Sequence, residues 1–194
     1  MVNNKILILG YGGQLSICLK KLQPKSFDCV YFTRKQLDIN DSKKILKVLK
    51  KIKPKFIINT AALTDVNFCE QNPKQCLMTN AYSVRNLAKY SSQINSFLIH
   101  FSSDFVYDGL KKIKYKESDY TKPISVYGKS KLLSEKYIKK YNKKHIIFRV
   151  SFIYSNYGNN FYKNVINKIR SSQITKIYKY QITNPTNAID FAKD

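Results

Sequence analysis

The start of this sequence constrains its fold more than any other stretch, because a short apolar run leads directly into a glycine-rich turn. Residues 5–9 contain the run from Ile6 to Leu9, which is typical of a strand buried on both faces of a parallel sheet. The turn occupies residues 10–13, and a helix is expected over 14–22. Glycines let a backbone approach a ligand closely, and a helix N-terminus offers free N–H groups. This order therefore predicts a site for a pyrophosphate group.

The rest of the chain alternates between strand-like runs and helical stretches. Further strands are predicted at residues 29–32, 56–59, 97–101 and 146–150. Helices are predicted at 42–52, at 74–92, around Tyr127 and after Asn160, and a short apolar stretch lies around Ile177 and Tyr178. Such alternation predicts an α/β fold with a doubly wound parallel sheet, the NAD(P)-binding Rossmann fold.

The net charge of +23 raises the hypothesis of nucleic-acid binding. Lysine far exceeds arginine, however, and in residues 42–52 the lysines face an apolar stripe, as in a helix with one solvated side. No apolar run reaches the roughly 18 residues of a membrane span, and the glycine turn interrupts the N-terminus in a way unlike a signal peptide. We expect a cytoplasmic protein without a nucleic-acid or membrane partner.

The cysteines and histidines give no sign of a metal site. The cysteines form no Cys-x-x-Cys pair and have no histidine at ligand spacing: Cys18, Cys29, Cys69 and Cys76. Free thiols and no metal are therefore expected. His100 and His145 each open or lie inside an apolar strand-like run, for which we expect structural roles.

Tyr127 and Lys131 are four residues apart and would share one face of a helix. A nearby ammonium group stabilises a phenolate, so such a tyrosine can exchange a proton with a reacting oxygen. Ser103 follows a predicted strand, at the end where doubly wound sheets bind ligands. These three side chains can therefore converge on a carbonyl oxygen.

The residue after the second strand should select the cofactor. An acidic side chain there binds a ribose hydroxyl, whereas an arginine suits the extra phosphate of NADP. The chain has Thr33 and Arg34 there and no acid before Asp38, which favours NADPH, with NADH as the alternative.

An ordered series of motifs extends over essentially the whole chain. It comprises Gly10-x-x-Gly13, Asp38-Ile39, Ala61-Ala62, Ser102-Ser103-Asp104 and Pro123-x-x-x-Tyr127-Gly128-x-x-Lys131-x-x-x-Glu135. This series resembles the extended short-chain dehydrogenases/reductases. Finer signatures resemble the dTDP-4-dehydrorhamnose reductases: Gly13-Gln14, Ser103 to Gly109, Arg149 to Tyr154, Gly158 to Phe161 and Gln181-x-x-x-Pro185-Thr186.

The resemblance implies NADPH-dependent reduction of the C4 keto group of dTDP-4-dehydro-L-rhamnose to dTDP-L-rhamnose, for surface polysaccharide such as lipopolysaccharide. By that resemblance Tyr127 would protonate the C4 oxygen, and Ser103 would hydrogen-bond it. Lys131 would hold the nicotinamide ribose and lower the pKa of Tyr127, while Asp104 and Phe152 would face the sugar nucleotide. The residues that would line the cofactor are Gly10, Gly13, Gln14, Leu15, Thr33, Arg34, Asp38, Ile39, Ala61, Ala62, Leu63, Phe101, Tyr127 and Lys131. The implied partner is the nucleotide-sugar substrate, and a homodimer is allowed.

The chain departs from the family pattern in a few places. Ser16 and Thr183 replace glycines, and Phe152 replaces a tryptophan. A side chain at Ser16 could crowd the approach of helix and strand. The family also continues beyond residue 194. We therefore expect one Rossmann domain over 1–194, in which about 152–194 begins an incomplete substrate-binding part.

Three other functions stay open on the sequence alone. One is a non-catalytic cofactor-binding or regulatory Rossmann subunit, since the regulatory subunit of methionine adenosyltransferase resembles the same family. The second is an inactive truncated remnant. The third is an epimerase or dehydratase of the same superfamily, because dehydratases place an acid beside the serine-type residue, as Asp104 stands beside Ser103.

Overall fold

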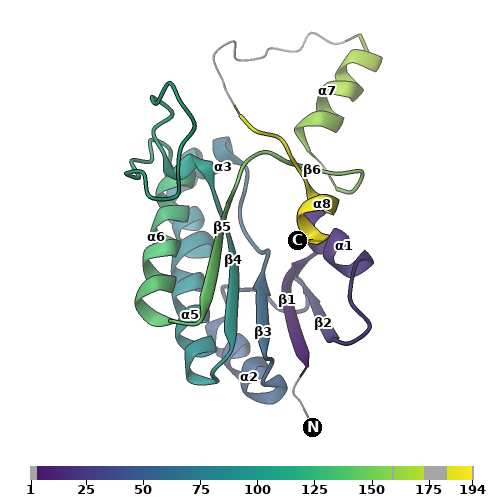
Figure 1. The fold of residues 1–194 in the computed structure, drawn as a ribbon, viewed down its shortest axis with the longest axis vertical. Helices are drawn as coiled ribbons and strands as arrows, with labels where there is room; N and C mark the ends of the chain where they lie inside the picture. Colours follow the sequence, from purple (N-terminus) through teal and green to yellow (C-terminus); the bar gives the residue numbers. More distant parts are fainter. Residues whose placement is uncertain (1–3, 159, 173–182, 194) are drawn as a thin grey trace.

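A five-stranded parallel sheet with strand order β2-β1-β3-β4-β5 forms the centre of the protein (Figure 1). The computed structural model describes residues 4–158, 160–172 and 183–193. The strands are β1 (Lys5–Tyr11), β2 (Asp28–Thr33), β3 (Phe56–Asn59), β4 (Phe97–Ser103) and β5 (His145–Val150). Each strand predicted from the sequence falls inside one of these, and the doubly wound α/β fold is confirmed.

The continuous apolar runs of the central strands are explained by helices on both faces of the sheet. Leu7 of β1 is aligned with Val30 of β2 on one side and with Ile57 of β3 on the other. Leu7, Ile57 and Leu98 of β4 are fully buried. A strand covered on both faces needs apolar side chains at successive positions rather than at alternate ones.

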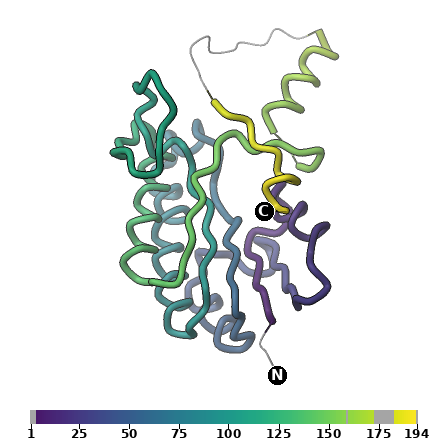
Figure 2. Tube along the Cα trace, viewed as in Figure 1, coloured from purple at the N-terminus to yellow at the C-terminus, as the bar shows by residue number. Residues whose placement is uncertain are grey.

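The helices divide between the two faces. On one face α5 (Ser83–Gln93) packs against α2 (Ser42–Ile52) and α6 (Val126–Tyr141), whereas α1 (Gln14–Lys21) packs against the C-terminal α8 (Ala188–Lys193) on the other (Figure 1). Figure 2 shows this C-terminal segment in yellow, returning to the purple N-terminal part of the chain. In α2 the apolar Ile45 and Leu49 are buried while the lysines are exposed, as the sequence pattern predicts.

The long helix predicted over 74–92 differs in detail. It starts at Pro73 as α4 (Pro73–Leu77), passes through a π-helical turn (Met78–Tyr82) and continues as α5. A further short helix, α3 (Val66–Gln71), precedes it. The π-turn places buried Asn80 against residue 63, a contact between distant segments that the apolar pattern does not reveal.

The last part of the chain adds a two-stranded sheet and two helices. Strand β6 (Ile153–Tyr154) pairs in parallel with β7 (Thr186–Asn187), and α7 (Phe161–Arg170) confirms the helix predicted after Asn160. The apolar stretch around residues 177 and 178 and the motif residue at 181 lie outside the described residues. Among the described helices, none combines the length and the apolar character needed to cross a membrane.

Candidate active site

The glycine turn between β1 and α1 is shaped by close packing on one side and open space on the other. Gly10 has φ +83°, and a Cβ there would lie 2.6 Å from the backbone nitrogen of Ala61. Gly12 has φ +108°, and nothing lies within 4 Å of a Cβ built there. Gly13 precedes α1 as its N-cap, without a side-chain cap. The backbone is therefore open at the N-terminus of α1, which suits a phosphate group.

Ser16 fits this turn without crowding it, contrary to the concern raised by the sequence. Its side chain is fully buried, and its hydroxyl donates to the carbonyl oxygens of Gly13 (2.9 Å) and Gly10 (3.2 Å). The serine thus satisfies carbonyl groups of the turn while occupying the position of a glycine.

The two residues after the glycines have internal partners. Leu15 is buried in the core. The side-chain oxygen of Gln14 accepts hydrogen bonds from Ser155 (3.1 Å) and Asn160 (3.0 Å), and its amide nitrogen donates to the Ile153 carbonyl (3.4 Å). The predicted cofactor residue Gln14 therefore connects these three residues to the glycine turn through hydrogen bonds.

The residues after β2 form a second part of the same edge. Thr33 pairs in the sheet with Tyr11, next to the glycine turn. Arg34 has 66% of its side chain exposed and forms an ion pair with Asp38 at 3.3 Å. Ile39 is buried in the core, whereas Arg34 is the most exposed member of this group.

The loop after β3 carries Ala61, Ala62 and Leu63, and a residue missed by sequence reasoning holds it. Asn80 accepts from the Leu63 N–H (2.8 Å) and donates to the Leu63 carbonyl (2.9 Å). The Ala61 N–H donates to the side chain of Asn59 at 3.2 Å. The only signal for Asn80 in the sequence is a polar residue within an otherwise buried helical segment.

Ser103 and Tyr127 meet where β4 ends and α6 begins. The hydroxyl of Ser125 caps α6 by accepting from the N–H of Gly128 at 3.0 Å. A Cβ at Gly128 would lie 2.2 Å from the Phe105 carbonyl oxygen, so glycine is needed where α6 packs against the turn that follows Ser103. This close approach brings the buried Tyr127 near Ser103.

The protonation of Tyr127 differs from the sequence expectation. Burial raises the pKa of Tyr127 to about 12, the interaction with the Ser103 side chain lowers it in part, and the charge of Asp104 raises it. The predicted lowering of this pKa by Lys131 is not among these effects. Tyr127 carries its proton at neutral pH.

Lys131 lies one turn further along α6 and is almost fully buried. Its ammonium group donates to the carbonyl oxygen of Phe101, while the ring of Phe101 stacks on Phe148 with 5.9 Å between ring centroids. Burial lowers the pKa of Lys131 to about 8, against a raising effect of the Glu135 carboxylate. Lysine and tyrosine thus stand side by side, both buried, with pKa values moved towards their neutral forms.

The two predicted substrate residues lie next to this group. Asp104 accepts from the hydroxyls of Ser103 (3.0 Å) and Ser151 (2.6 Å). Phe152 has φ +45°, which is rare for a bulky residue, and its ring lies edge-on to Phe161 with 5.0 Å between centroids. Strained backbone of this kind concentrates at functional sites.

The histidines and cysteines lie mainly in the protein interior. His100 is buried between Asn59 (3.1 Å) and Ser134 (3.1 Å), and burial lowers its pKa. His145 contacts the carbonyl of Asn142. The four cysteines are free thiols, and the described part of the chain contains no cluster of three or more side chains able to bind a metal ion.

Comparisons with known proteins show which proteins the whole chain is similar to. The dTDP-4-dehydrorhamnose reductase of Aggregatibacter actinomycetemcomitans is 35% identical over 190 residues, which cover 97% of this chain and 65% of the relative. The enzyme of that name from Escherichia coli K12 is 34% identical, with 94% of this chain and 62% of the relative covered. The chain therefore spans somewhat less than two thirds of the length of these curated relatives.

Solved structures show the same likeness. A dTDP-4-dehydrorhamnose reductase of Bacillus anthracis in complex with NADP superposes with a TM-score of 0.93 at 32% identity, covering 99% of this chain and 69% of that one. A Clostridium acetobutylicum dTDP-4-dehydrorhamnose reductase gives a TM-score of 0.93 at 34% identity, with 97% and 68% covered. The family model described as the RmlD substrate binding domain matches residues 4–194. This protein belongs to the RmlD substrate binding domain family.

Proposed function

We propose that this chain carries the NADPH-dependent reduction of the C4 keto group of dTDP-4-dehydro-L-rhamnose to dTDP-L-rhamnose, a step that serves surface polysaccharide. The observation that carries the proposal is the placement of Ser103, Tyr127 and Lys131 at the carboxyl edge of the sheet, where the Ser103 side chain is close enough to Tyr127 to affect its pKa. Relatives named dTDP-4-dehydrorhamnose reductase share 35% and 34% identity with the chain.

The described residues fit a dinucleotide cofactor. The open backbone at Gly12 and the uncapped N-terminus of α1 suit the pyrophosphate. Exposed Arg34 beyond β2 suits the extra phosphate of NADP, because a guanidinium binds phosphate through a fork of N–H groups. The other residues that we expect around the cofactor are Gly10, Gly13, Gln14, Leu15, Thr33, Asp38, Ile39, Ala61, Ala62, Leu63, Phe101, Tyr127 and Lys131.

The side chains of Tyr127, Ser103 and Lys131 provide the proton and the charge stabilisation that the reduction needs. A bound nicotinamide supplies the hydride that the C4 carbon receives. Tyr127 donates its phenolic proton to the C4 oxygen, which completes the change from ketone to alcohol. A pKa of about 12 keeps that proton on Tyr127 until the substrate oxygen gains negative charge. The hydroxyl of Ser103 and the ammonium of Lys131 stabilise that charge.

The substrate side of the site is formed by Asp104 and Phe152. We propose that about residues 152–194 begin the substrate-binding part, since β6, β7 and α7 all follow the Rossmann sheet and Phe152 packs on α7. Asp104 has two hydroxyl partners in place, so its carboxylate is already oriented.

A direct assay tests the proposed reaction. The purified chain is incubated with NADPH and dTDP-4-dehydro-L-rhamnose, and the C4 proton of the product is followed by NMR spectroscopy. Using NADPH deuterated at its transferable position should place deuterium at C4 of dTDP-L-rhamnose. A folded chain that binds NADPH and forms no such product would overturn the proposal.

A second candidate is a cofactor-binding subunit without catalysis of its own. The features that suit a cofactor, the open backbone at Gly12 and the exposed Arg34, do not depend on the three proposed catalytic side chains. This candidate predicts NADPH binding in the absence of turnover, and a binding affinity for a partner enzyme that depends on NADPH.

A further inference from the structure

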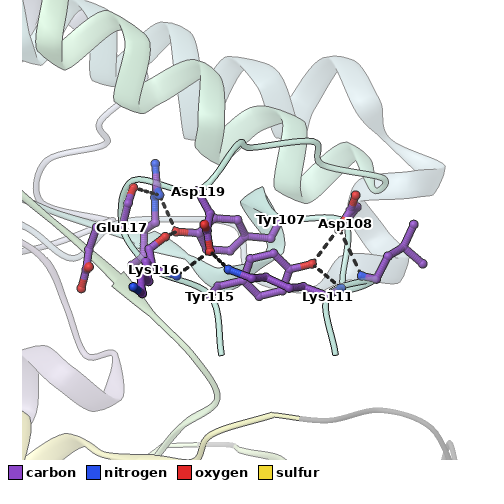
Figure 3. A network of polar contacts seen from close by, with 9 residues as sticks. Tyr107, Asp108, Lys111, Tyr115, Lys116, Glu117 and Asp119 are labelled. Carbon is purple, nitrogen blue, oxygen red and sulfur yellow. Dashed lines mark hydrogen bonds and ion pairs between the residues drawn. The ribbon is translucent and has the colours of Figure 1, made fainter. Parts of the chain in front are cut away.

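The loop between Ser103 and Tyr127 is held by an internal network of polar side chains (Figure 3). Within residues 107–122, the rings of Tyr107 and Tyr115 stack with 4.3 Å between centroids, and the Tyr115 hydroxyl donates to Asp108 at 2.7 Å. Asp119 accepts from the backbone N–H of Lys116 at 2.7 Å and forms an ion pair with Lys111. The loop is thus an ordered unit with its own contacts.

Arg149 on β5 joins this loop to helix α6. Its Nη1 donates to the Tyr107 hydroxyl at 2.6 Å and to the Glu117 carbonyl at 3.1 Å. The other side of the same guanidinium forms two bonds to Glu135, Nε to Oε1 at 3.0 Å and Nη2 to Oε2 at 2.7 Å. A single planar group therefore contacts the loop and the helix together, a geometry that lysine lacks.

Glu135 is a buried carboxylate one helical turn after Lys131. Its side chain is 2% exposed, and a buried charge is costly unless it is paired. The groups that face Lys131 are Glu135 on its own helix, Cys76 from α4, His100 from β4 and the carbonyl oxygen of Phe101. Among them Glu135 is the carboxylate, and its charge favours the ammonium form of Lys131.

We propose that Arg149 and Glu135 are positioning residues of the Tyr127–Lys131 site. Their ion pair fastens the loop 107–122 to α6 and keeps a negative charge beside the Lys131 ammonium. The inference rests on the proposed function for its catalytic meaning, because it takes the protonated Lys131 as the form that stabilises the developing charge. Neither residue contacts a reacting atom.

Limited trypsin digestion of the full chain tests whether Arg149 holds the loop 107–122 against α6. The loop contains Lys111, Lys112, Lys114 and Lys116 as cleavage sites, whereas the bond after Lys122 precedes Pro123 and resists trypsin. Arg149→Lys keeps the charge and loses the fork, so we expect cleavage in 107–122 to become about tenfold faster, as the loss of charge-assisted hydrogen bonds implies. Arg170→Lys, on exposed α7, is the matched control and should match the parent. If Arg149→Lys does not fold, Tyr107→Phe removes the hydroxyl that accepts from Arg149 and donates to the Lys116 carbonyl, and it should accelerate cleavage at least as much.

NMR titration of Lys131 tests whether the Glu135 carboxylate favours the ammonium form of this lysine. Lysine is labelled with carbon-13 at Cε, and the Lys131 resonance is the one that disappears in Lys131→Met. In Glu135→Gln the ammonium loses its neighbouring carboxylate while Arg149 stays, so the titration midpoint should move down by about one pH unit. A merely structural role for Glu135 would leave the midpoint in place. Unchanged loop cleavage in folded Arg149→Lys or Tyr107→Phe, or an unchanged Lys131 midpoint in Glu135→Gln, would overturn the inference.

Both measurements are made on the chain without sugar substrate. Their outcomes are therefore separate from that of the reductase assay. A chain that lacks reductase turnover and still shows faster loop cleavage and the shifted midpoint would retain the positioning pair and lose the proposed reaction.

Discussion

The side-chain amide of Asn80 holds the backbone of Leu63 at both its N–H and its carbonyl, at 2.8 and 2.9 Å. The Asn80 amide thus forms the same pair of hydrogen bonds that a backbone segment of a neighbouring strand would form, and it holds the loop after β3 in place. Because the same loop backs the glycine turn at Gly10, Asn80 sets one wall of the proposed cofactor site from a distant helix.

Replacement of Asn80 should therefore weaken both stability and cofactor binding. Asn80→Ala removes the side chain that pairs with the half-buried Leu63 backbone and with the Ser130 hydroxyl, and we expect the free energy of unfolding to fall by about 2–4 kcal/mol. Urea unfolding and NADPH fluorescence titration measure the two effects. Asn164→Ala, at an exposed position of α7, is the control and should change neither. Unaltered NADPH affinity in folded Asn80→Ala would show that this loop does not line the cofactor.

Two glycines with similar backbone angles separate packing from backbone strain. Gly10 (φ +83°) faces the backbone of Ala61 at 2.6 Å, whereas Gly109 (φ +74°) has nothing within 4 Å of a Cβ. Gly109→Ala should cost about 1–3 kcal/mol from its conformation alone. Gly10→Ala should cost clearly more, because β1 or the Ala61 loop must shift. Equal losses in thermal unfolding of the two variants would refute the close approach.

The buried Lys131 should make the stability depend on pH. Its pKa is lowered by burial from 10.5 to about 8 in the folded protein. Between these values the unfolded chain binds more protons, so the Lys131 contribution to stability rises with pH from about 8 to 10.5 and is lost as pH falls through about 8. Lys131→Met removes this dependence and should be the more stable form at pH 7, by at most about 3 kcal/mol. A stability difference between the two proteins that stays constant from pH 7 to 10.5 would contradict the burial argument.

Arg34 should determine the choice of cofactor. Arg34→Ala removes the exposed guanidinium beyond β2, and we expect the affinity for NADPH to fall about tenfold with little change for NADH. Dissociation constants for both cofactors measure this directly. Arg170→Ala controls for the loss of one positive charge. A variant that loses affinity for both cofactors equally would indicate a structural role for the pair with Asp38.

The sequence predicts the sheet and the placement of Tyr127 and Lys131 on one helix, because both follow from local patterns. Apolar runs such as 5–9 mark strands buried on two faces, and the Tyr127–Lys131 spacing places both side chains on one turn of a helix. The pKa of Tyr127 was mispredicted because burial is a property of the packed structure, and spacing alone showed only the neighbouring lysine.

Contacts between distant segments are the other feature that the sequence does not predict. The Gln14 bonds to residues 153–160, the Asn80 clamp and the Arg149 fork join positions far apart in the chain, and no periodic pattern marks them. Ser16 shows the same limit. The sequence predicts crowding at this position, but the buried hydroxyl forms hydrogen bonds with the carbonyl groups of the turn, so the side chain fits.

In the proposed reaction Tyr127 delivers the proton to the ketone oxygen, and the rate of NADPH oxidation with dTDP-4-dehydro-L-rhamnose reports on this step. Tyr127→Phe removes a single hydroxyl and should lower kcat by about 10²–10⁴-fold while NADPH affinity stays close to that of the parent. Tyr120→Phe, at a tyrosine that is 85% exposed, is the matched control and should keep full activity. Turnover by Tyr127→Phe at the parental rate would contradict the account.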